Sequence, residues 1–455
     1  MARQMTMRLH REPLIVDCFA GGGGASTGIE MALGRSPDIA INHDPEAVAM
    51  HAENHPSTRH YCESVWKVDP IEATGGAPVG LAWFSPDCTF FSRARGAKPI
   101  RRSDKPVRSL AWVVVRWAKE VRPRVILVEN VAEILDWGPL NDEGRPCSER
   151  AGVTFRRWWR AMEVAGYRGE FRKLKAHHYG APTTRERLFV VFRCDDEATI
   201  IPPATHGPGL LPYRTAAECM DWTQPCPSIF GRARPLVENT LARIARAINR
   251  YVINAATPFI VPGQTNTISP TLIQMGWGER EGQEPRVFDI HQPLSTVVAG
   301  GVKHALVAAC LARHFGGTFK NDGAALTAPL PTITTQDHHA LVYAFLDTYY
   351  GSGGNEGSLR EPLRTITTHD RFALVTVRGE PHRIVDVGQR MLVPRELYRA
   401  QGFPDRYRID FSIGPKPLSK TAQVRMVGNS VAPHVVAALV RANVNANRSQ
   451  VERAA

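Results

Sequence analysis

The chain of 455 residues is long enough to bury a sizeable core and to form two domains. Lys and Arg (56 residues) outnumber Asp and Glu (44 residues), and the resulting net charge of +12 favours a polyanionic partner such as nucleic acid. The eight cysteines form no CxxC pair or zinc-type cluster, and the chain has neither an apolar signal core nor a run of about 18 apolar residues, so we expect a cytoplasmic protein without a metal site, a membrane span or structural disulfides.

Short apolar strands alternate with helices over the first 195 residues. Each strand is apolar throughout, which is typical of strands that are buried on both faces of a parallel sheet. The predicted strands are 14–16, 39–41, 81–84 and 125–128, and the predicted helices follow the glycines at 21–24, run through 48–50 and span 110–121. This order predicts an α/β fold with a doubly wound, mostly parallel sheet.

Four polar or reactive side chains stand at or just past the ends of these strands: Asp17, Asn42, Cys88 and Glu129. Ligands of doubly wound sheets bind at the carboxyl ends of the strands, so we expect these side chains to line one cleft. Cys88 leads into a polar loop, as expected of a nucleophile rather than of a cysteine buried for packing. Glu129 has a second interpretation, as the cap of the next helix.

Residues 17–24, with the sequence DCFAGGGG, form a glycine-rich turn from strand to helix. A dinucleotide-binding GxGxxG pattern that begins at Gly21 and Gly23 requires a third glycine where the chain has Ser26, which argues against NAD. Bare glycines let a ligand approach the backbone, and the N-terminus of the following helix favours a carboxylate. A methionine-type cofactor carries such a carboxylate, whereas a tight turn without a ligand is the other interpretation.

The composition changes at about residue 196, where Pro, Thr and Gly become frequent and helical periodicity is confined to 236–252. A motif of the form Pro-Leu-x-Thr, followed by a short apolar strand, occurs three times, beginning at Pro293, Pro329 and Pro362. We interpret this repeat as a packing unit of a β-rich region with polar loops between its copies.

After about residue 386 the α/β character returns. One helix is predicted over 394–401 and another after Gly428-Asn429-Ser430. Six motifs now stand in a fixed order along the chain. They are Asp17–Gly24 with Ser26 and Gly28, Ser85–Ser92, Glu129-Asn130-Val131, Tyr179-Gly180-Ala181-Pro182 with Arg185-Glu186-Arg187, Arg395-Glu396-Leu397 with Gln401-Gly402-Phe403-Pro404, and Gln423 with Gly428-Asn429-Ser430-Val431 and Pro433.

In these motifs and their order the chain resembles the cytosine-C5 DNA methyltransferases over 13–195 and 386–443. The resemblance implies a Rossmann-like, S-adenosylmethionine-dependent domain formed by 1–195 and 386–455. It also implies that 196–385 is an inserted β-rich target recognition domain with its linker helix. We expect a monomer that acts on double-stranded DNA, and the residues assigned to the cofactor site are Asp17, Phe19, Ala20, Gly21, Gly23, Gly24, Asn42, His43, Ser64, Pro86, Asn429 and Ser430.

Cytosine C5 is not nucleophilic, so a methyl group cannot be transferred to it directly. The resemblance implies that the Cys88 thiolate adds to C6 while Glu129 protonates or hydrogen-bonds N3, which leaves an enamine whose C5 attacks the methyl group. Arg185 and Arg187 lie two residues apart, face the same way on a strand and are expected to orient the base, the loop or a phosphate. Because C6 is inaccessible inside a duplex, the cytosine must be flipped out.

The loop after the nucleophile is rich in basic residues as far as Arg108. We expect these charges to contact DNA phosphates from the catalytic side, with Ser92, Arg93, Arg95 and Lys98 as DNA-binding residues. A solvated basic surface without a ligand is the alternative. No nuclease motif is present, so the chain is expected to mark or protect DNA rather than to cut it.

Three positions depart from the pattern of the family. Asp87 precedes the nucleophile where proline is usual, and its carboxylate is expected to raise the pKa of the neighbouring thiol unless Arg93 or Arg95 offsets it. Asn42 stands where an acid usually holds the ribose, and Thr183 stands where glutamine is usual. Two alternatives therefore remain open: an RNA cytosine-C5 methyltransferase, because a similar motif set serves RNA, and a catalytically inactive DNA-binding relative.

Overall fold

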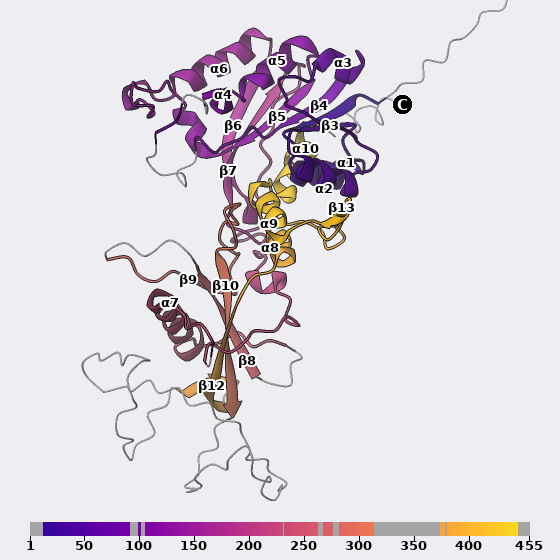
Figure 1. Ribbon diagram of the computed structural model, residues 1–455. Coiled ribbons are helices and arrows are strands. Elements are labelled where there is room, and N and C mark those ends of the chain that lie inside the picture. Colours follow the sequence, from indigo (N-terminus) through magenta and orange to yellow (C-terminus); the bar gives the residue numbers. More distant parts are fainter. Residues whose placement is uncertain are drawn as a thin grey trace, which may run out of the picture. The chain divides into compact units, whose positions relative to one another are not determined.

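The computed structural model describes residues 12–91, 99–101, 105–230, 232–262, 267–275, 282–313, 374–377 and 380–444. The chain divides into two compact units, each described by itself (Figure 1). Unit 1 comprises Met1–Cys219, Pro293–Gly301 and Val393–Ala455, and unit 2 comprises Met220–Gln292 and Val302–Leu392. Unit 2 thus begins and ends later than the 196–385 expected from composition, and the short segment Pro293–Gly301 belongs to unit 1.

A seven-stranded sheet forms the centre of unit 1, in the order β3-β2-β1-β4-β5-β7-β6. Its strands are β1 (Leu14–Cys18), β2 (Ile39–Asn42), β3 (Arg59–Cys62), β4 (Val79–Phe84), β5 (Val125–Asn130), β6 (Arg168–Lys175) and β7 (Glu186–Arg193). The first five pair in parallel, whereas β7 runs antiparallel to both β5 and β6. The predicted doubly wound, mostly parallel sheet is confirmed.

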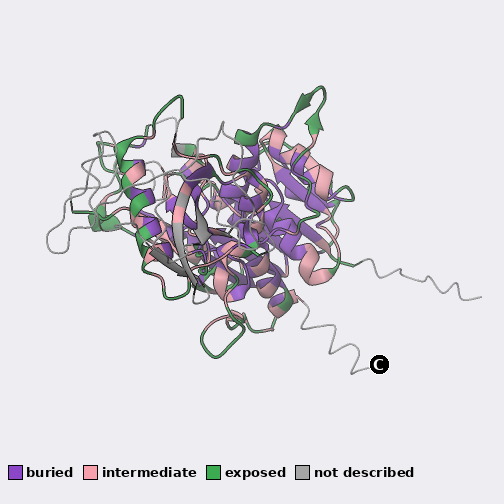
Figure 2. Cartoon of the chain, turned by 90° about the horizontal axis from the view of Figure 1, so that it is seen from below, coloured by how far each residue is buried: buried purple, intermediate pink, exposed green. Residues whose placement is uncertain are grey.

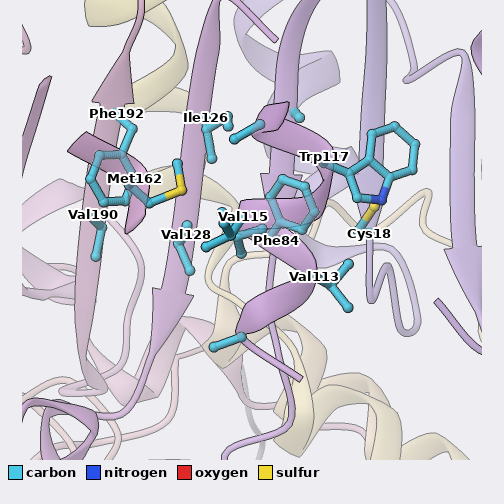
Figure 3. Close-up of a cluster of buried hydrophobic side chains, with 14 of the residues drawn as sticks. Cys18, Phe84, Val113, Val115, Trp117, Ile126, Val128, Met162, Val190 and Phe192 are labelled. Carbon is cyan, nitrogen blue, oxygen red and sulfur yellow. The ribbon is translucent and has the colours of Figure 1, made fainter. Parts of the chain in front are cut away.

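Helices pack on both faces of this sheet. On one face α5 (Trp112–Glu120) and α6 (Val153–Val164) bury large side chains, among them Trp117 and Met162, against strand residues such as Phe84 (Figure 3). On the other face α1 (Gly24–Leu33) and α10 (Pro433–Val444) pack on the sheet around Trp83. A buried tryptophan removes about 150–250 Å² from water, at ~25 cal/mol per Å², so these layers supply much of the hydrophobic stabilisation.

The remaining helices of unit 1 are short and lie between the strands or near the C-terminal end. They are α2 (Pro45–Asn54), α3 (Pro70–Thr74), α4 (Lys105–Arg108), α8 (Pro394–Gln401) and α9 (Lys420–Asn429), with 3-10 turns at Ala132–Asp136, Ser148–Arg150, Ala176–Tyr179 and Ala216–Cys219. Two of them begin with the same Asp-Pro pair, in which the aspartate caps the helix and the proline fixes its first turn: Asp44 accepts from the Glu46 N–H, and Asp69 from the Ile71 and Glu72 N–H groups.

Close packing of α1 on α10 depends on Gly28. A methyl group at this position would lie 2.5 Å from the Pro433 carbonyl oxygen and 2.8 Å from Val436 Cγ1, both of which are too close. We expect Gly28→Ala to lower the free energy of unfolding, because overpacking costs about 1–3 kcal/mol and exceeds the gain of at most about 1 kcal/mol in helix propensity. Urea unfolding measures this change, with Gly300→Ala as the control because no atom of the described residues would lie within 4 Å of a methyl group at Gly300. A midpoint for Gly28→Ala at or above that of the parent would contradict this account of the packing.

Unit 2 contains a five-stranded antiparallel sheet in the order β11-β12-β10-β8-β9. The elements are α7 (Glu238–Ile248), a π-helical turn (Asn249–Ile253), β8 (Thr267–Gln274), β9 (Val287–Phe288), β10 (His304–Arg313), β11 (Leu374–Val377) and β12 (Glu380–Met391). The β-rich character is confirmed, as is the helix predicted over 236–252. The apolar stretch of the first repeat copy begins β10, whereas the second copy and most of the third lie outside the described residues.

The central strands β1, β4 and β5 of unit 1 are almost wholly buried. Figure 2 colours the buried residues of the chain purple and the exposed ones green. Among the described residues, no helix combines the length and apolar character needed to cross a bilayer. The same part of the chain holds no group of three or more His, Cys, Asp or Glu side chains arranged to bind a metal ion.

Candidate active site

Cys88 lies in the loop that follows β4, and hydrogen bonds hold this loop on both sides of the thiol. The Asn130 side-chain amide donates to the Pro86 carbonyl oxygen at 2.9 Å, which ties the loop to the end of β5. The Asp87 Oδ1 atom accepts from the Thr89 N–H at 2.6 Å, and the Cys88 carbonyl oxygen accepts from the Phe91 N–H at 2.9 Å. The nucleophile predicted from sequence thus stands in a turn with a defined backbone.

Glu129 lies near the end of β5 and is largely buried, with its side chain 9% exposed. It forms an ion pair with Arg187, whose Nε atom is 3.3 Å from Glu129 Oε1. Burial raises the pKa of Glu129, and the charges of Arg187 and Arg185 oppose that rise. The alternative interpretation as a helix cap is wrong, because Val131 occupies the N-cap position of the following 3-10 turn.

Arg185 immediately precedes β7 and is buried, so it is not part of a solvated basic edge. Its Nη1 atom donates to the Val297 carbonyl oxygen at 3.3 Å and to the Gly428 carbonyl oxygen at 3.1 Å. Burial lowers the pKa of Arg185 to about 9. Thr183, which replaces the usual glutamine, is fully buried and accepts from the Arg185 N–H at 3.4 Å.

The four predicted catalytic side chains act on one another electrostatically. Burial raises the pKa of the Cys88 thiol, and the Glu129 carboxylate raises it further. Arg187 lowers this pKa, Asp87 raises it and Arg185 lowers it, in decreasing order of effect. The expected direction for Asp87 is confirmed, although burial and Glu129 contribute more. Because β4, β5 and β7 are neighbours in the sheet, their ends bring together a thiol, a carboxyl group and two guanidinium groups.

The glycine-rich turn between β1 and α1 adopts an unusual backbone. Gly21 and Gly23 have φ angles of 52° and 86°, which favour glycine, and Phe19 also has a positive φ of 65°. Asp17, at the end of β1, is completely buried. Its Oδ2 atom accepts from the Ser26 hydroxyl at 2.6 Å, whereas Oδ1 has no hydrogen-bond partner among the described residues. Burial raises the pKa of Asp17 to about 7.

Ser26, which breaks the dinucleotide pattern, belongs to a buried polar chain that sequence reasoning missed. Its Oγ atom lies 2.8 Å from His51 Nε2, and His51 Nδ1 lies 2.8 Å from His60 Nε2. Burial lowers the pKa of His51 well below its usual range. The Ser26 hydroxyl therefore connects Asp17 to two histidines, His51 of α2 and His60 of β3. No sequence pattern marks these histidines.

The other predicted cofactor residues fall at the same edge of the sheet. Asn42 ends β2, where its Oδ1 atom accepts from the Asp44 N–H at 2.9 Å, and the next residue, His43, is exposed. Ser64 is half-buried after β3, and Pro86 is buried after β4. Since these strands are parallel neighbours, their carboxyl ends meet at one edge together with Phe19, Ala20 and the glycines.

The C-terminal residues approach this edge from α9, a helix that sequence reasoning did not predict. Asn429 is its last residue and is exposed, and Ser430 is buried just beyond it. A side chain on Gly24 would collide with the Ser430 hydroxyl and the Val431 carbonyl oxygen, so Ser430 lies directly against the turn. The Gln401 side-chain amide donates to the Ser430 carbonyl oxygen at 2.7 Å and holds it there.

The structure describes only part of the basic loop that was expected to contact DNA. Arg108, counted among the charges for phosphates, is buried, donates to the Gly138 carbonyl oxygen at 3.1 Å and lies 5.5 Å from the Phe91 ring centre, so its role is structural. The predicted DNA-binding residues lie outside the described residues: Ser92, Arg93, Arg95 and Lys98.

The segment Pro293–Gly301, expected in the recognition region, packs beside Arg185 instead. Leu294 forms a parallel bridge with Thr183, and its carbonyl oxygen accepts from the Thr184 N–H at 2.9 Å. The first repeat copy therefore begins with a segment of unit 1. The repeated Pro-Leu-x-Thr pattern marked this segment but did not indicate its partner.

Comparison with known proteins agrees with this geometry. The sequence profile of the C-5 cytosine-specific DNA methylases matches residues 14–208 and 332–445, which is more than half of the chain. The chain belongs to this family. It is 30% identical over 196 residues to the type II methyltransferase M.AgeI of Thalassovita gelatinovora, which is 42% of each chain. It is 28% identical over 215 residues to the type II methyltransferase M.SacI of Streptomyces achromogenes, which is 44% of this chain and 52% of that one.

These matches span about half the length of the two relatives. The fold resemblance extends further: the crystal structure of a mutant DNMT2 of Spodoptera frugiperda superposes with a TM-score of 0.50 at 12% identity and covers 94% of this chain and 98% of that chain. Membership of the C-5 cytosine methylase family and its Rossmann-like α/β fold are thus established for this chain.

Proposed function

We propose that this chain is a DNA (cytosine-5-)-methyltransferase that transfers a methyl group from S-adenosylmethionine to C5 of a flipped cytosine. The observation that carries the proposal is the meeting of Cys88, Glu129, Arg185 and Arg187 at neighbouring strand ends in a chain of the C-5 cytosine methylase family. A thiol, an acid and fixed cations are the groups that activation of a pyrimidine ring requires.

In the proposed reaction the Cys88 thiolate forms an S–C6 bond as the C5=C6 π bond opens. Glu129 donates its proton, or a hydrogen bond, to N3, and N3 thereby accepts the electron density displaced into the ring. S-adenosylmethionine, when bound, would supply an electrophilic methyl group to the nucleophilic C5, and its S–CH3 bond would break to leave S-adenosylhomocysteine. A base then removes the C5 proton, the S–C6 bond breaks, the thiolate returns to Cys88, and any proton that N3 received returns to Glu129.

Arg185 and Arg187 have different tasks in this proposal. Arg187 pairs with Glu129 and lowers its pKa against the rise that burial causes. The buried Arg185 instead donates hydrogen bonds to the Val297 and Gly428 carbonyl oxygens. A guanidinium fixed in this way is preorganised to hold the exocyclic oxygen of the base or the nucleophile loop, at no reorganisation cost during the reaction.

The turn at the end of β1 fits the assigned cofactor. The unpartnered Oδ1 atom of the buried Asp17 needs a donor or a cation, which the ammonium group of a methionine moiety provides. The backbone at Gly21 is open, because within the described parts of the chain a methyl group on its Cα would have only the Phe19 carbonyl oxygen within 4 Å, and this leaves room for a ligand. Ser430 and the N-terminus of α1 would face its carboxylate.

Asn42 is proposed to hold the ribose. Its Oδ1 atom is used by the Asp44 N–H, so the Nδ2 donor remains for a hydroxyl. We expect Asn42→Ala to weaken S-adenosylmethionine binding about tenfold, the effect of losing one hydrogen bond of about 1.4 kcal/mol. Calorimetric titration measures this, with Asn54→Ala at the far end of α2 as the matched control. An S-adenosylmethionine affinity of Asn42→Ala equal to that of Asn54→Ala and of the parent would show that Asn42 does not bind the cofactor.

DNA is the proposed substrate because the matching family is described as DNA methylases and the chain carries a +12 charge. Unit 2, with its antiparallel sheet, is proposed to read the target sequence. Transfer of labelled methyl groups to duplex DNA and to RNA, followed by nucleoside mass spectrometry, tests this proposal. We expect 5-methylcytosine in DNA alone. Label in RNA alone would identify an RNA methyltransferase, and cofactor binding without transfer to either would identify an inactive relative.

A further inference from the structure

The residue before the nucleophile differs from the proline usual in the family, and the structure shows what this aspartate does. Asp87 is exposed, yet its carboxylate is not free: Oδ1 accepts from the Thr89 N–H at 2.6 Å. This hydrogen bond closes a turn around Cys88, which forms the next turn through the Phe91 N–H. The thiol therefore stands where two consecutive turns overlap.

The backbone on the other side of Asp87 is held as well. The Pro86 carbonyl oxygen accepts from the Asn130 amide, so the loop is tied to β5 just before the aspartate. Proline before a nucleophile restricts the chain covalently, because its ring fixes φ. Aspartate lacks that restriction, and a side-chain hydrogen bond two residues ahead supplies a comparable one.

We propose that Asp87 is a positioning residue that replaces the usual proline: its carboxylate oxygen orders the Cys88 turn, and its charge acts on the adjacent thiol. This inference rests on the proposed function. Its two parts are separable, because the hydrogen bond needs only an acceptor oxygen whereas the electrostatic effect needs a charge. Asparagine keeps the acceptor and loses the charge, and alanine loses both.

Several described charged groups act on the Cys88 thiol from the elements around it. Glu129 on β5 and Asp87 in the loop disfavour the thiolate, whereas Arg187 on β7 and Arg185 just before it favour it. We expect Glu129, Arg187 and Arg185 to stay in place in the Asp87 variants. Removal of the Asp87 charge therefore changes the pKa of Cys88 in one definite direction. The pKa of Cys88 falls, and thiolate appears at lower pH.

The test compares Asp87→Asn and Asp87→Ala with the parent and with Asp69→Ala. Asp69 makes the same type of hydrogen bond, to the N–H two residues ahead, at the start of α3, and it lies outside the proposed active site. Three quantities are measured: kcat as a function of pH, the pH dependence of Cys88 alkylation by iodoacetamide followed by peptide mass spectrometry, and hydrogen exchange of the Thr89 amide.

Both Asp87 variants are expected to shift the alkylation midpoint to lower pH. Only Asp87→Ala is expected to lose protection of the Thr89 amide and to lower the maximal kcat about ten- to hundredfold, the usual cost of a misplaced reacting group. Asp87→Asn stays within about threefold of the parent, and Asp69→Ala matches it throughout.

Equal kcat and equal Thr89 protection in the parent and Asp87→Ala would overturn the positioning role. Alkylation midpoints that do not move in either variant would overturn the electrostatic role. If the parent itself transfers no methyl group, the proposed function fails, while alkylation and hydrogen exchange still decide both parts of this inference.

Discussion

Cys88→Ala is expected to reduce methyl transfer to DNA by roughly 10⁴-fold or more, because removal of a covalent nucleophile leaves only binding and electrostatic effects. S-adenosylmethionine affinity should change by less than about twofold, since Cys88 holds the base rather than the cofactor in the proposed reaction. Single-turnover transfer of labelled methyl groups and calorimetric titration of the cofactor measure the two quantities.

The matched control for this prediction is Cys62→Ala. Cys62 is also a free cysteine, but it is exposed at the end of the edge strand β3. Its loss should leave transfer unchanged. Substantial methylation by Cys88→Ala, or an equal loss in Cys62→Ala, would rule out Cys88 as the nucleophile.

Glu129→Gln is expected to have the second largest effect, lowering kcat about 10²–10⁴-fold, the usual contribution of a general acid. Glutamine has nearly the same shape and can still hydrogen-bond Arg187, so cofactor and DNA affinity should change little. Glu163→Gln, on the outer surface of α6 where Glu163 pairs with Arg160, provides the control. A kcat within about threefold of the parent would exclude Glu129 as the acid at N3.

The pH dependence of the rate gives a further signature of Glu129. Thiolate at Cys88 increases as pH rises toward its raised pKa, whereas protonated Glu129 decreases as pH rises through its own raised pKa. The parent rate should therefore rise and then fall with pH. In Glu129→Gln the fall caused by Glu129 disappears, so the rate follows thiolate formation alone and keeps rising with pH toward the pKa of Cys88. An unchanged pH profile in this variant would contradict the assigned coupling.

Sequence patterns sufficed for the residues at the ends of buried strands. Cys88 and Glu129 follow continuous apolar runs, and the rule that parallel strands present their carboxyl ends at one edge brings them together. The same rule groups Asp17 and Asn42. The apolar runs that predict each strand also predict that the strands are buried in a parallel sheet, so a single sequence suffices to place the residues at their ends.

Other parts depend on long-range packing that leaves no local signal. β3 and β6 are the two edge strands of the sheet, and their mostly polar sequences interrupt the apolar pattern that marks central strands. Pro293–Gly301 packs beside Arg185 although its composition matches the region around it. Arg108 is a charged residue in the sequence, but in the structure it is buried with its guanidinium over the Phe91 ring. Its aliphatic stem can be buried there because the ring takes the place of water around the charge.

The most direct test of the central claim is bisulfite sequencing of plasmid DNA from cells that express this chain, beside cells that express Cys88→Ala. The account predicts protected cytosines at one recurring short sequence in the first sample and none in the second. Plasmid without protected cytosines, from cells with folded protein that binds S-adenosylmethionine, would contradict the claim that this chain methylates DNA at cytosine C5.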